Sequence, residues 1–268
     1  MSLEIVVCLK QVPHPDHFSQ ISLDPAKQTI TREGIPAVIN PLDKNALEQG
    51  LRLREHFSGR VTVISMGPPQ TQSALEEALA MGADRGVLLC DRAFAGADTL
   101  ATAHALALAV RKLEPFDLIL CGNETIDSAT GQVGPQLAEV LDIPHVTYVQ
   151  EVALAHERRL AVRRAMEYGY MKVEVTLPAL LAMVKESNRP RLPTVWGIME
   201  AAQKEIRLWT AADVGATPEA VGLEGSPTRV IGVFEQQARR RGEVLEGAPD
   251  EVARRAVAKL RELGAFRA

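Results

Sequence analysis

The sequence predicts an α/β fold built on a doubly wound, mostly parallel sheet, with additional antiparallel strands and an extended C-terminal arm. Short apolar runs alternate with helical segments through the first half of the 268-residue chain. The runs are apolar throughout, as in strands buried on both faces. The composition, 46% hydrophobic and 24% charged, is that of a globular protein long enough to bury its own core.

The alternation begins close to the N-terminus. Strands rich in Val, Ile and Leu are predicted over residues 3–9, 60–66, 86–90 and 117–121. Helices are predicted over residues 40–57, 71–81, 99–113 and 131–141. Asn40-Pro41 and Asp98 supply helix starts, and Gly82 supplies a stop. Strand–helix alternation at this spacing indicates a parallel, Rossmann-like sheet with helices on both faces. A small hairpin of residues 21–23 and 29–31 is also predicted.

The second half of the chain follows a different pattern. Residues 145–155, 160–165 and 170–177 alternate apolar and polar side chains and predict additional antiparallel strands, and residues 178–184 are strongly apolar. One or two helical turns are predicted over residues 198–203, and an amphipathic helix over residues 248–263. Between them, residues 208–234 lack periodicity but contain several apolar side chains, and they predict an extended arm that wraps a partner subunit. The predicted domains are therefore a nucleotide-binding domain, residues 1–207, and an arm with a terminal helix that pack on a partner subunit, residues 208–268.

The net charge and the cysteine pattern argue against several classes of protein. The net charge is −4 and aromatic residues make up 4% of the chain, which argues against nucleic-acid binding. Cys8, Cys90 and Cys121 each end an apolar run, without disulfide or zinc spacing, as in the reducing cytoplasm. There is no signal peptide or apolar run of membrane-spanning length, so we expect a cytoplasmic protein without membrane insertion.

The best candidate site is the loop after the strand that ends at Cys121. In an open parallel sheet, ligands bind beyond the carboxyl ends of the strands. There, residues 122–134 combine glycines, hydroxyl groups and a helix start, which suit a phosphate. Their spacing is neither that of the common dinucleotide fingerprint nor that of a P-loop, and the alternative is a simple tight turn. His14 and His17 lie in a proline-bounded loop near this edge, as solvated side chains or as ligand contacts.

Several segments together resemble the β-subunit of electron transfer flavoproteins. The specific stretch is Val162-Arg163-Arg164-Ala165-Met166-Glu167, followed by Leu177-Pro178 and then Asn188-Arg189-Pro190-Arg191. Shorter matches precede it in the same order: residues 6–13, Asn40-Pro41-Leu42-Asp43, residues 66–69, residues 80–84 and residues 122–132. The resemblance spans nearly the whole chain.

The resemblance implies an electron-carrier subunit rather than an enzyme, with no catalytic residue of its own. Its partner would be an α-subunit that holds most of the FAD, and the heterodimer would pass electrons from dehydrogenases, such as acyl-CoA dehydrogenases of fatty acid oxidation, to a respiratory-chain quinone oxidoreductase. A nucleotide in this subunit would be AMP, or a second FAD as in an electron-bifurcating branch that residues 91–102 resemble. The implied nucleotide-binding residues are Cys8, Asn40, Pro41, Leu42, Asp43, Met66, Gly122, Asn123, Glu124, Thr125, Ile126, Asp127, Ser128, Ala129, Thr130, Gly131, Gln132 and Val133. Val195, beside Trp196, matches the family's anchor for dehydrogenases.

Two other functions compete with the electron carrier. A nucleotide-binding hydrolase or ligase subunit needs a base or metal carboxylates, for which Glu124 and Asp127 are the candidates. A nucleotide-sensing module needs the same pocket but no electron transfer. A visible spectrum of the complex separates the electron carrier from both.

Overall fold

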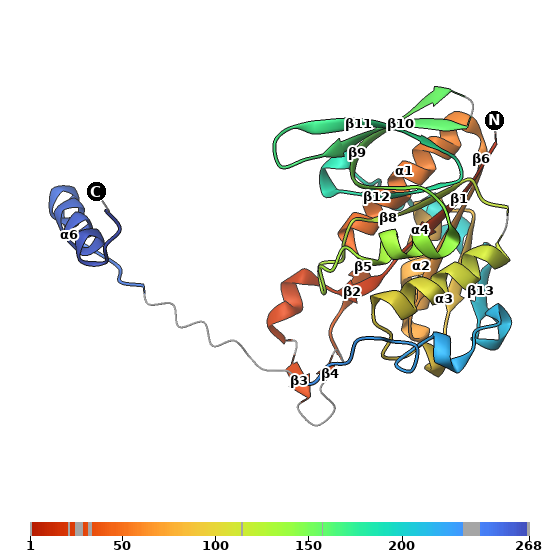
Figure 1. Ribbon diagram of the computed structural model, residues 1–268, viewed down its shortest axis with the longest axis horizontal. Helices are drawn as coiled ribbons and strands as arrows, with labels where there is room; N and C mark the ends of the chain where they lie inside the picture. Colours follow the sequence, from red (N-terminus) through yellow and green to blue (C-terminus); the bar gives the residue numbers. More distant parts are fainter. Residues whose placement is uncertain are drawn as a thin grey trace. The chain divides into compact units, whose positions relative to one another are not determined.

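A nine-stranded sheet lies at the centre of the chain in the computed structural model (Figure 1). The structure describes residues 2–20, 22–24, 29–31, 34–113, 115–156, 158–232 and 242–266. They form two units, Met1–Ile231 and Gly232–Ala268. The sheet belongs to the first unit, with strand order β11-β10-β9-β12-β8-β1-β6-β7-β13. The predicted boundary between residues 207 and 208, and the packing of the arm on a partner, stay predictions.

Six strands run parallel in the middle and at one end of this sheet. They are β1 (Leu3–Cys8), β6 (Gly59–Met66), β7 (Arg85–Leu89), β8 (Leu118–Gly122), β12 (Ala179–Met183) and β13 (Ile206–Trp209). The carboxyl ends of β1, β6, β7 and β8 therefore meet at one edge of the sheet. The predicted α/β class with a mostly parallel sheet is confirmed.

Helices cover both faces of the parallel strands (Figure 1). On one face, α1 (Pro41–Phe57) and α2 (Gln72–Met81) share a hydrophobic core with β1, β6 and β8, and the short α5 (Val195–Ala201) packs on α2. On the other face, α3 (Thr99–Lys112) and α4 (Val133–Leu141) pack against a second apolar cluster. The parallel strands are thus buried from both sides, which explains why apolar residues point to both faces of the sheet instead of alternating with polar ones.

An antiparallel ribbon extends the sheet beyond β12. It consists of β9 (His145–His156), β10 (Arg159–Ala165) and β11 (Tyr170–Thr176), and β10 is antiparallel to both of its neighbours. The prediction of antiparallel strands is confirmed for these pairs. The first residues of β9 differ, because they pair with β12 in parallel.

Small elements refine the prediction. The short strands β3 (Ser22–Asp24) and β4 (Thr29–Thr31) form the predicted hairpin, although Ile21 lies outside the described residues. Gln11–Pro13 (β2) pairs with Ala37–Ile39 (β5) in a separate two-stranded sheet that was not predicted. Short 3-10 turns cover Pro15–Gln20, Pro69–Thr71, Arg92–Phe94, Lys185–Ser187, Ala212–Val214 and Pro218–Ala220.

The segment predicted as an irregular arm from Leu208 onward begins inside the fold. Residues 206–209 form β13, and Trp209, Val214 and Val221 are buried in the cluster that contains α3. Val230 and Ile231 are exposed, whereas Val233 and Phe234 lie outside the described residues. The irregular, exposed part therefore starts later than predicted.

The described residues of the second unit, 232 and 242–266, contain one helix. It is α6 (Pro249–Glu262), and it matches the amphipathic helix predicted over residues 248–263. None of its residues is buried. Throughout the described residues, every helix is too short or too polar to cross a bilayer.

Candidate functional site

A cavity of about 1010 Å³ opens at the carboxyl edge of the parallel strands. Its walls are the residues after β1, β6, β7 and β8 together with the first turns of α3 and α4. The volume lies at the upper end of the ~300–1,000 Å³ range of small-molecule sites. The cavity is where an open α/β sheet is expected to bind its ligand.

Two side chains of the α1 start fasten the loop that follows β8. Asn40 is fully buried, its amide donates to the Glu124 carbonyl at 2.9 Å, and its side-chain oxygen accepts from the Ile126 N–H at 3.2 Å. The Asp43 carboxylate accepts from the N–H of Lys10 at 2.7 Å and from the N–H of Gly122 at 2.9 Å. One short segment of helix therefore joins the ends of β1 and β8.

Gly122 is required by this close approach. A Cβ at Gly122 would lie 2.5 Å from the Asp43 Oδ1 and 2.8 Å from the Leu42 Cβ. Burial raises the pKa of Asp43 from 3.8 to about 6, although the N–H groups of Lys10 and Gly122 favour its ionised form. Asp43 is thus a buried acid whose partners are mainly backbone amides.

Lys10 holds the far side of the same loop. Its ammonium lies 2.8 Å from the Asp127 carboxylate and 3.0 Å from the Ser128 hydroxyl. Burial is the largest single influence on Asp127 and opposes its ionisation, but the hydrogen bond and charge of Lys10 together with the hydroxyl groups of Thr125 and Ser128 outweigh it, so the pKa of Asp127 is lowered. A carboxylate neutralised in this way is a weak base, which disfavours the hydrolase hypothesis.

The two helix starts at the cavity differ in their caps. The Asp98 carboxylate accepts from the N–H groups of Leu100 and Ala101, so the first turn of α3 is satisfied and already holds a negative charge. α4 has no side-chain cap, so its first N–H groups and its positive dipole end remain for a ligand. The α4 start is therefore the better phosphate site, and Gln132 there accepts from the Thr99 hydroxyl at 3.1 Å.

All three cysteines line the cavity. Cys8 and Cys121 are buried at the ends of the neighbouring strands β1 and β8. Burial and, less, the charge of Asp43 raise the pKa of the Cys8 thiol to about 12, and burial raises that of Cys121 as well. Both are protonated at neutral pH and form an uncharged, polarizable wall.

The structure brings most of the predicted site residues to one place. Twelve of them line the cavity: Cys8, Asp43, Met66, Gly122, Asn123, Glu124, Thr125, Ser128, Thr130, Gly131, Gln132 and Val133. Asn40, Pro41, Leu42, Ile126, Asp127 and Ala129 are not in the lining, and of these Asn40 and Asp127 fasten the loop as described above. Nucleotide binding by these residues stays a prediction.

One wall of the cavity was missing from the list of implied nucleotide-binding residues, although residues 91–102 resemble the electron-bifurcating branch. It is formed by residues 90–92 and 94–99 and by Thr102, from the end of β7 to the first turn of α3. The position after an apolar strand was the available signal for it. His14 and His17 lie outside the lining, and among the described residues no group of three acidic, His or Cys side chains can hold a metal ion.

The root of the C-terminal arm is attached to this wall. The Thr228 hydroxyl donates to the Asp98 carboxylate at 2.6 Å, and the Asp98 N–H donates to the Ser226 hydroxyl at 2.8 Å. The Leu223 N–H donates to the Ala95 carbonyl at 3.0 Å. Residues 223–228 thus run along the outer side of the cavity wall.

The segment predicted to dock a partner is exposed, not part of the core. Val195 is 78% and Trp196 68% exposed on α5, with Met199 beside them on the helix. Thr194 caps this helix by accepting from the Gly197 N–H at 3.0 Å. A Cβ at Gly197 would lie 2.3 Å from the Ala80 carbonyl oxygen, so this glycine lets α5 approach the end of α2.

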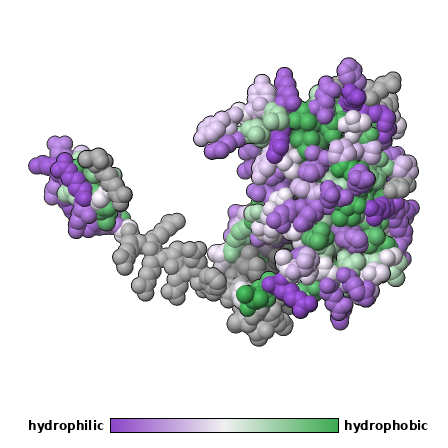
Figure 2. Space-filling model, in the orientation of Figure 1, coloured by the Kyte–Doolittle hydropathy of each residue, from purple (hydrophilic) through white to green (hydrophobic). Residues whose placement is uncertain are grey.

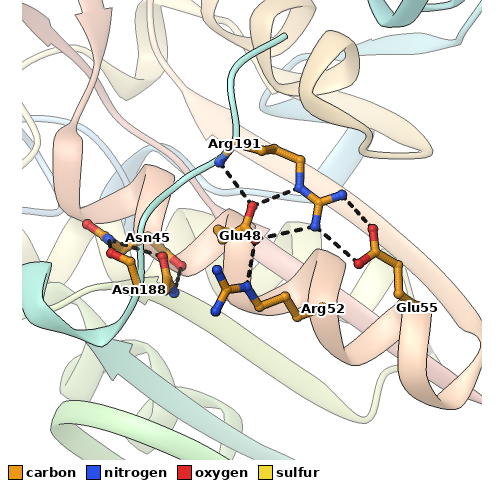
Figure 3. A network of polar contacts seen from close by, with 6 residues as sticks. All are labelled: Asn45, Glu48, Arg52, Glu55, Asn188 and Arg191. Carbon is orange, nitrogen blue, oxygen red and sulfur yellow. Dashed lines mark hydrogen bonds and ion pairs between the residues drawn. The ribbon is translucent and has the colours of Figure 1, made fainter. Parts of the chain in front are cut away.

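A polar network holds the chain before α5 against α1 (Figure 3). Asn188 and Asn45 exchange hydrogen bonds, each side-chain amide donating to the other's backbone carbonyl at 3.0 and 2.8 Å. The Arg191 guanidinium binds both Glu48 and Glu55, with Nε 2.8 Å from Glu48. The Asn-x-Pro-Arg motif thus fixes the position of α5.

Known proteins are similar to this chain over most of its length. A family model described as electron transfer flavoprotein domain matches residues 28–214. The electron transfer flavoprotein subunit beta of Clostridium acetobutylicum is 49% identical, over 97% of this chain and 98% of the relative. Subunit CarD of the caffeyl-CoA reductase-Etf complex of Acetobacterium woodii is 45% identical, over 97% and 98%. Protein FixA of Azotobacter vinelandii is 42% identical, over 95% and 93%.

Proposed function

The chain belongs to the electron transfer flavoprotein family as a β-subunit, and from this we propose that it holds a nucleotide in the cavity at the carboxyl edge of its sheet. As a β-subunit it forms a heterodimer with an α-subunit, in which a flavin, when bound, supplies the one- and two-electron chemistry. The residues of this chain bind the nucleotide and position it. The single observation that carries the proposal is the cavity between the fastened loop after β8 and the uncapped start of α4.

The phosphate end of the nucleotide lies at the start of α4 in this proposal. The unpaired N–H groups and dipole of that helix favour an anion. Gly131, at φ +62, lets the chain turn into the helix, and the Thr130 and Ser128 hydroxyls line the same end of the cavity. The apolar side chains of Met66 and Leu106 and the thiols of Cys8 and Cys121 offer contacts for flat rings.

We favour a second FAD over AMP in this cavity. A volume of about 1010 Å³ exceeds what a mononucleotide needs, and the wall of residues 90–99 extends the lining beyond the loop after β8. A complex with two flavins could split an electron pair between two acceptors, so electron bifurcation is part of this proposal.

Nucleotide analysis of the co-expressed heterodimer tests this proposal. The complex is purified by gel filtration and denatured, and the released nucleotides are quantified by chromatography and mass spectrometry. We expect two FAD per heterodimer. One FAD and one AMP would show that this subunit holds AMP instead of a second flavin. One FAD and no other nucleotide would contradict nucleotide binding by this subunit. A Gly131→Val variant should retain less of the nucleotide, because a side chain costs about 1–2 kcal/mol in the left-handed conformation that Gly131 adopts.

We further propose that Val195 anchors electron-donating dehydrogenases. An exposed aliphatic side chain on a helix fixed by its own network loses little entropy on binding. One relative's printed name joins an Etf with a reductase of a CoA thioester, and by analogy we propose acyl-CoA dehydrogenases as the donors. The final acceptor we propose is a respiratory-chain quinone oxidoreductase, and the free cysteines favour a cytoplasmic location.

Kinetics with a partner dehydrogenase test the anchor. Val195→Ala should raise the KM for the flavoprotein roughly 5–30-fold, as for an interface anchor worth about 1–2 kcal/mol. The flavin spectrum should be unchanged, and the Tm should shift no more than it does for an ordinary surface substitution. An unchanged KM would place the docking site elsewhere.

A further inference from the structure

A segment from the C-terminal part of the chain, residues 211–228, lies against the outer side of the cavity wall that precedes α3. We call this segment the strap. In Figure 1 it is the blue chain that continues from β13 and passes below α3, and in Figure 2 the same lower side of the molecule is mostly purple and white. Among the described residues, none of the strap lines the cavity, so the strap can affect a ligand there only through the wall.

The wall is bound to the strap at both of its ends by an aspartate. The Asp91 carboxylate accepts from the Ala211 N–H at 3.0 Å, and it also accepts from the Ala93 N–H of the wall itself. The Asp98 carboxylate accepts from the N–H and the hydroxyl of Thr228, at 3.1 and 2.6 Å. The carboxylates that shape the wall are therefore the same ones that attach it to the strap.

Between these two attachments the strap and the wall are in close backbone contact. A Cβ at Gly222 would overlap the Ala93 carbonyl oxygen, and a Cβ at Gly96 would lie 3.1 Å from the Leu223 Cβ. Ala93 is the one residue between 90 and 99 that is outside the cavity lining. Its carbonyl thus faces the strap, while the residues on either side of it face the cavity.

A buried serine and an apolar contact fix the distance between the two segments. Ser226 is 6% exposed, and its hydroxyl accepts from the Asp98 N–H at 2.8 Å and donates to the Gly222 carbonyl at 2.6 Å. Val221 of the strap and Phe94 of the wall are buried in the same apolar cluster. Moving the wall away from the strap would leave buried polar groups without partners, which is costly.

The strap also binds the negative charge that the wall places beside the cavity. Burial opposes ionisation of Asp98, but hydrogen bonds from Thr228 and from the first N–H groups of α3 lower its pKa. An ionised carboxylate repels a nearby phosphate unless donors take up its charge, and the Thr228 hydroxyl is such a donor on the side away from the cavity. The next residue, Thr99, donates to Gln132 at the start of α4, so the strap is connected through the wall to the expected phosphate site.

We propose that the strap sets the nucleotide selectivity of the cavity: by holding the wall in place, it favours a dinucleotide such as FAD over a mononucleotide such as AMP, with Thr228 as a positioning residue. A mononucleotide whose phosphate lies at the start of α4 is held by the loop after β8, whereas a dinucleotide also extends along the wall. Loosening the wall should therefore weaken FAD more than AMP. The proposal rests on the proposed function, because it concerns the nucleotide of the same cavity.

Competition between the two nucleotides in the intact heterodimer tests the strap. Heterodimers with the wild-type chain or a variant are saturated with FAD, incubated with increasing AMP and passed through gel filtration, and the bound nucleotides are quantified after denaturation. FAD that remains at saturating AMP belongs to the α-subunit and is subtracted. In Thr228→Val, the AMP concentration that displaces half of the remaining FAD should fall at least about fivefold, because valine keeps the shape of threonine but loses the hydrogen bond to Asp98.

Two matched variants separate positioning from a general effect of substitution. Thr228→Ser keeps the hydroxyl and should restore the wild-type displacement concentration. Thr217→Val removes the hydroxyl of another exposed threonine of the strap, which makes no capping hydrogen bond, and should change this concentration less than about twofold. A wild-type value for Thr228→Val overturns the proposal. So does an equal loss of affinity for FAD and for AMP measured separately, because Thr228 would then only stabilise the cavity.

The remaining outcomes are also decisive. Thr228 is exposed, so Thr228→Val should keep the wild-type Tm; if it does not fold, Ser226→Ala replaces it, with the same expected shift and the same overturning result. A wild-type heterodimer that binds neither nucleotide in this subunit contradicts the proposed function. A wild-type heterodimer that binds AMP but no FAD in this subunit overturns selection by the strap, while nucleotide binding in the cavity stands.

Discussion

Replacing Asp43 by Asn should change how the stability of this chain depends on pH. The amide keeps one acceptor oxygen, so either Lys10 or Gly122 loses the acceptor of its buried N–H. Such a loss costs about 1–3 kcal/mol at any pH. At pH 4, where Asp43 of the wild type is protonated in the folded state, the variant should therefore be less stable than the wild type.

The difference between the two proteins should shrink as the pH rises. The pKa of Asp43 is raised from 3.8 to about 6 on folding, so the folded state holds a proton that the unfolded state has released. Stability contributed by this proton is fully present below pH 3.8 and is lost as the pH rises through 6. At about 1.4 kcal/mol for each tenfold change in proton affinity, the wild type loses about 3 kcal/mol that the variant keeps.

Urea unfolding of both proteins at pH 4, 5, 6, 7 and 8, followed by circular dichroism, measures this effect. The variant should be less stable by about 1–3 kcal/mol at pH 4 and equal or more stable at pH 8. Asp117→Asn is the control variant. Asp117 also accepts a hydrogen bond from a strand amide, the Glu4 N–H, but it lies at the opposite edge of the sheet. Parallel profiles for Asp43→Asn and the wild type would refute the reasoning.

Three further predictions concern the site and the arm. Gly122→Ala should lower stability by about 1–3 kcal/mol in urea unfolding, because its Cβ would overlap Asp43 and Leu42; an unchanged midpoint would contradict the packing. Arg191→Met leaves the buried Glu48 with Arg52 as its single cation and loosens the chain before α5, so the KM for a dehydrogenase should rise. An unchanged KM would show that docking does not depend on this network. Truncation after residue 231 should weaken co-purification with the α-subunit, and wild-type recovery would exclude the terminal unit from the interface.

Much of the fold was predictable because its strands are buried on both faces. Continuous apolar runs such as Leu118–Gly122 can be recognised without knowledge of their neighbours. Residues 206–209 escaped prediction because β13 is an edge strand, in which a charged Arg207 and an exposed Leu208 separate the half-buried Ile206 from the buried Trp209. The beginning of α5 was missed because Trp196-Gly197 is a poor helix sequence, and its helix depends on packing against α2.

The site was predictable where it is local in sequence. The loop after β8 carries its glycines, hydroxyls and helix start within one stretch, and the structure brings twelve predicted residues to the cavity. The wall before α3 had a local signal, its place after an apolar strand, but the contacts that attach it and the loop after β8 to distant segments had none. Asp98 bonds Thr228 across 130 positions of the sequence, and Lys10 bonds Asp127 across 117. Such pairings depend on the order of strands, which a single sequence leaves open.

The length of α1 has a consequence for how the gene can vary. Its first turn fastens the loop after β8 through Asp43, and its later turns hold the chain before α5 through Glu48 and Glu55. A deleted or inserted residue between Asp43 and Glu48 would rotate one attachment against the other by about 100° and move it by about 1.5 Å. Substitutions along the exposed side of α1 are tolerable, but frame-preserving insertions and deletions inside it would separate the cavity from the helix that carries Val195. We expect natural variants of this gene to keep α1 at constant length while their loops differ.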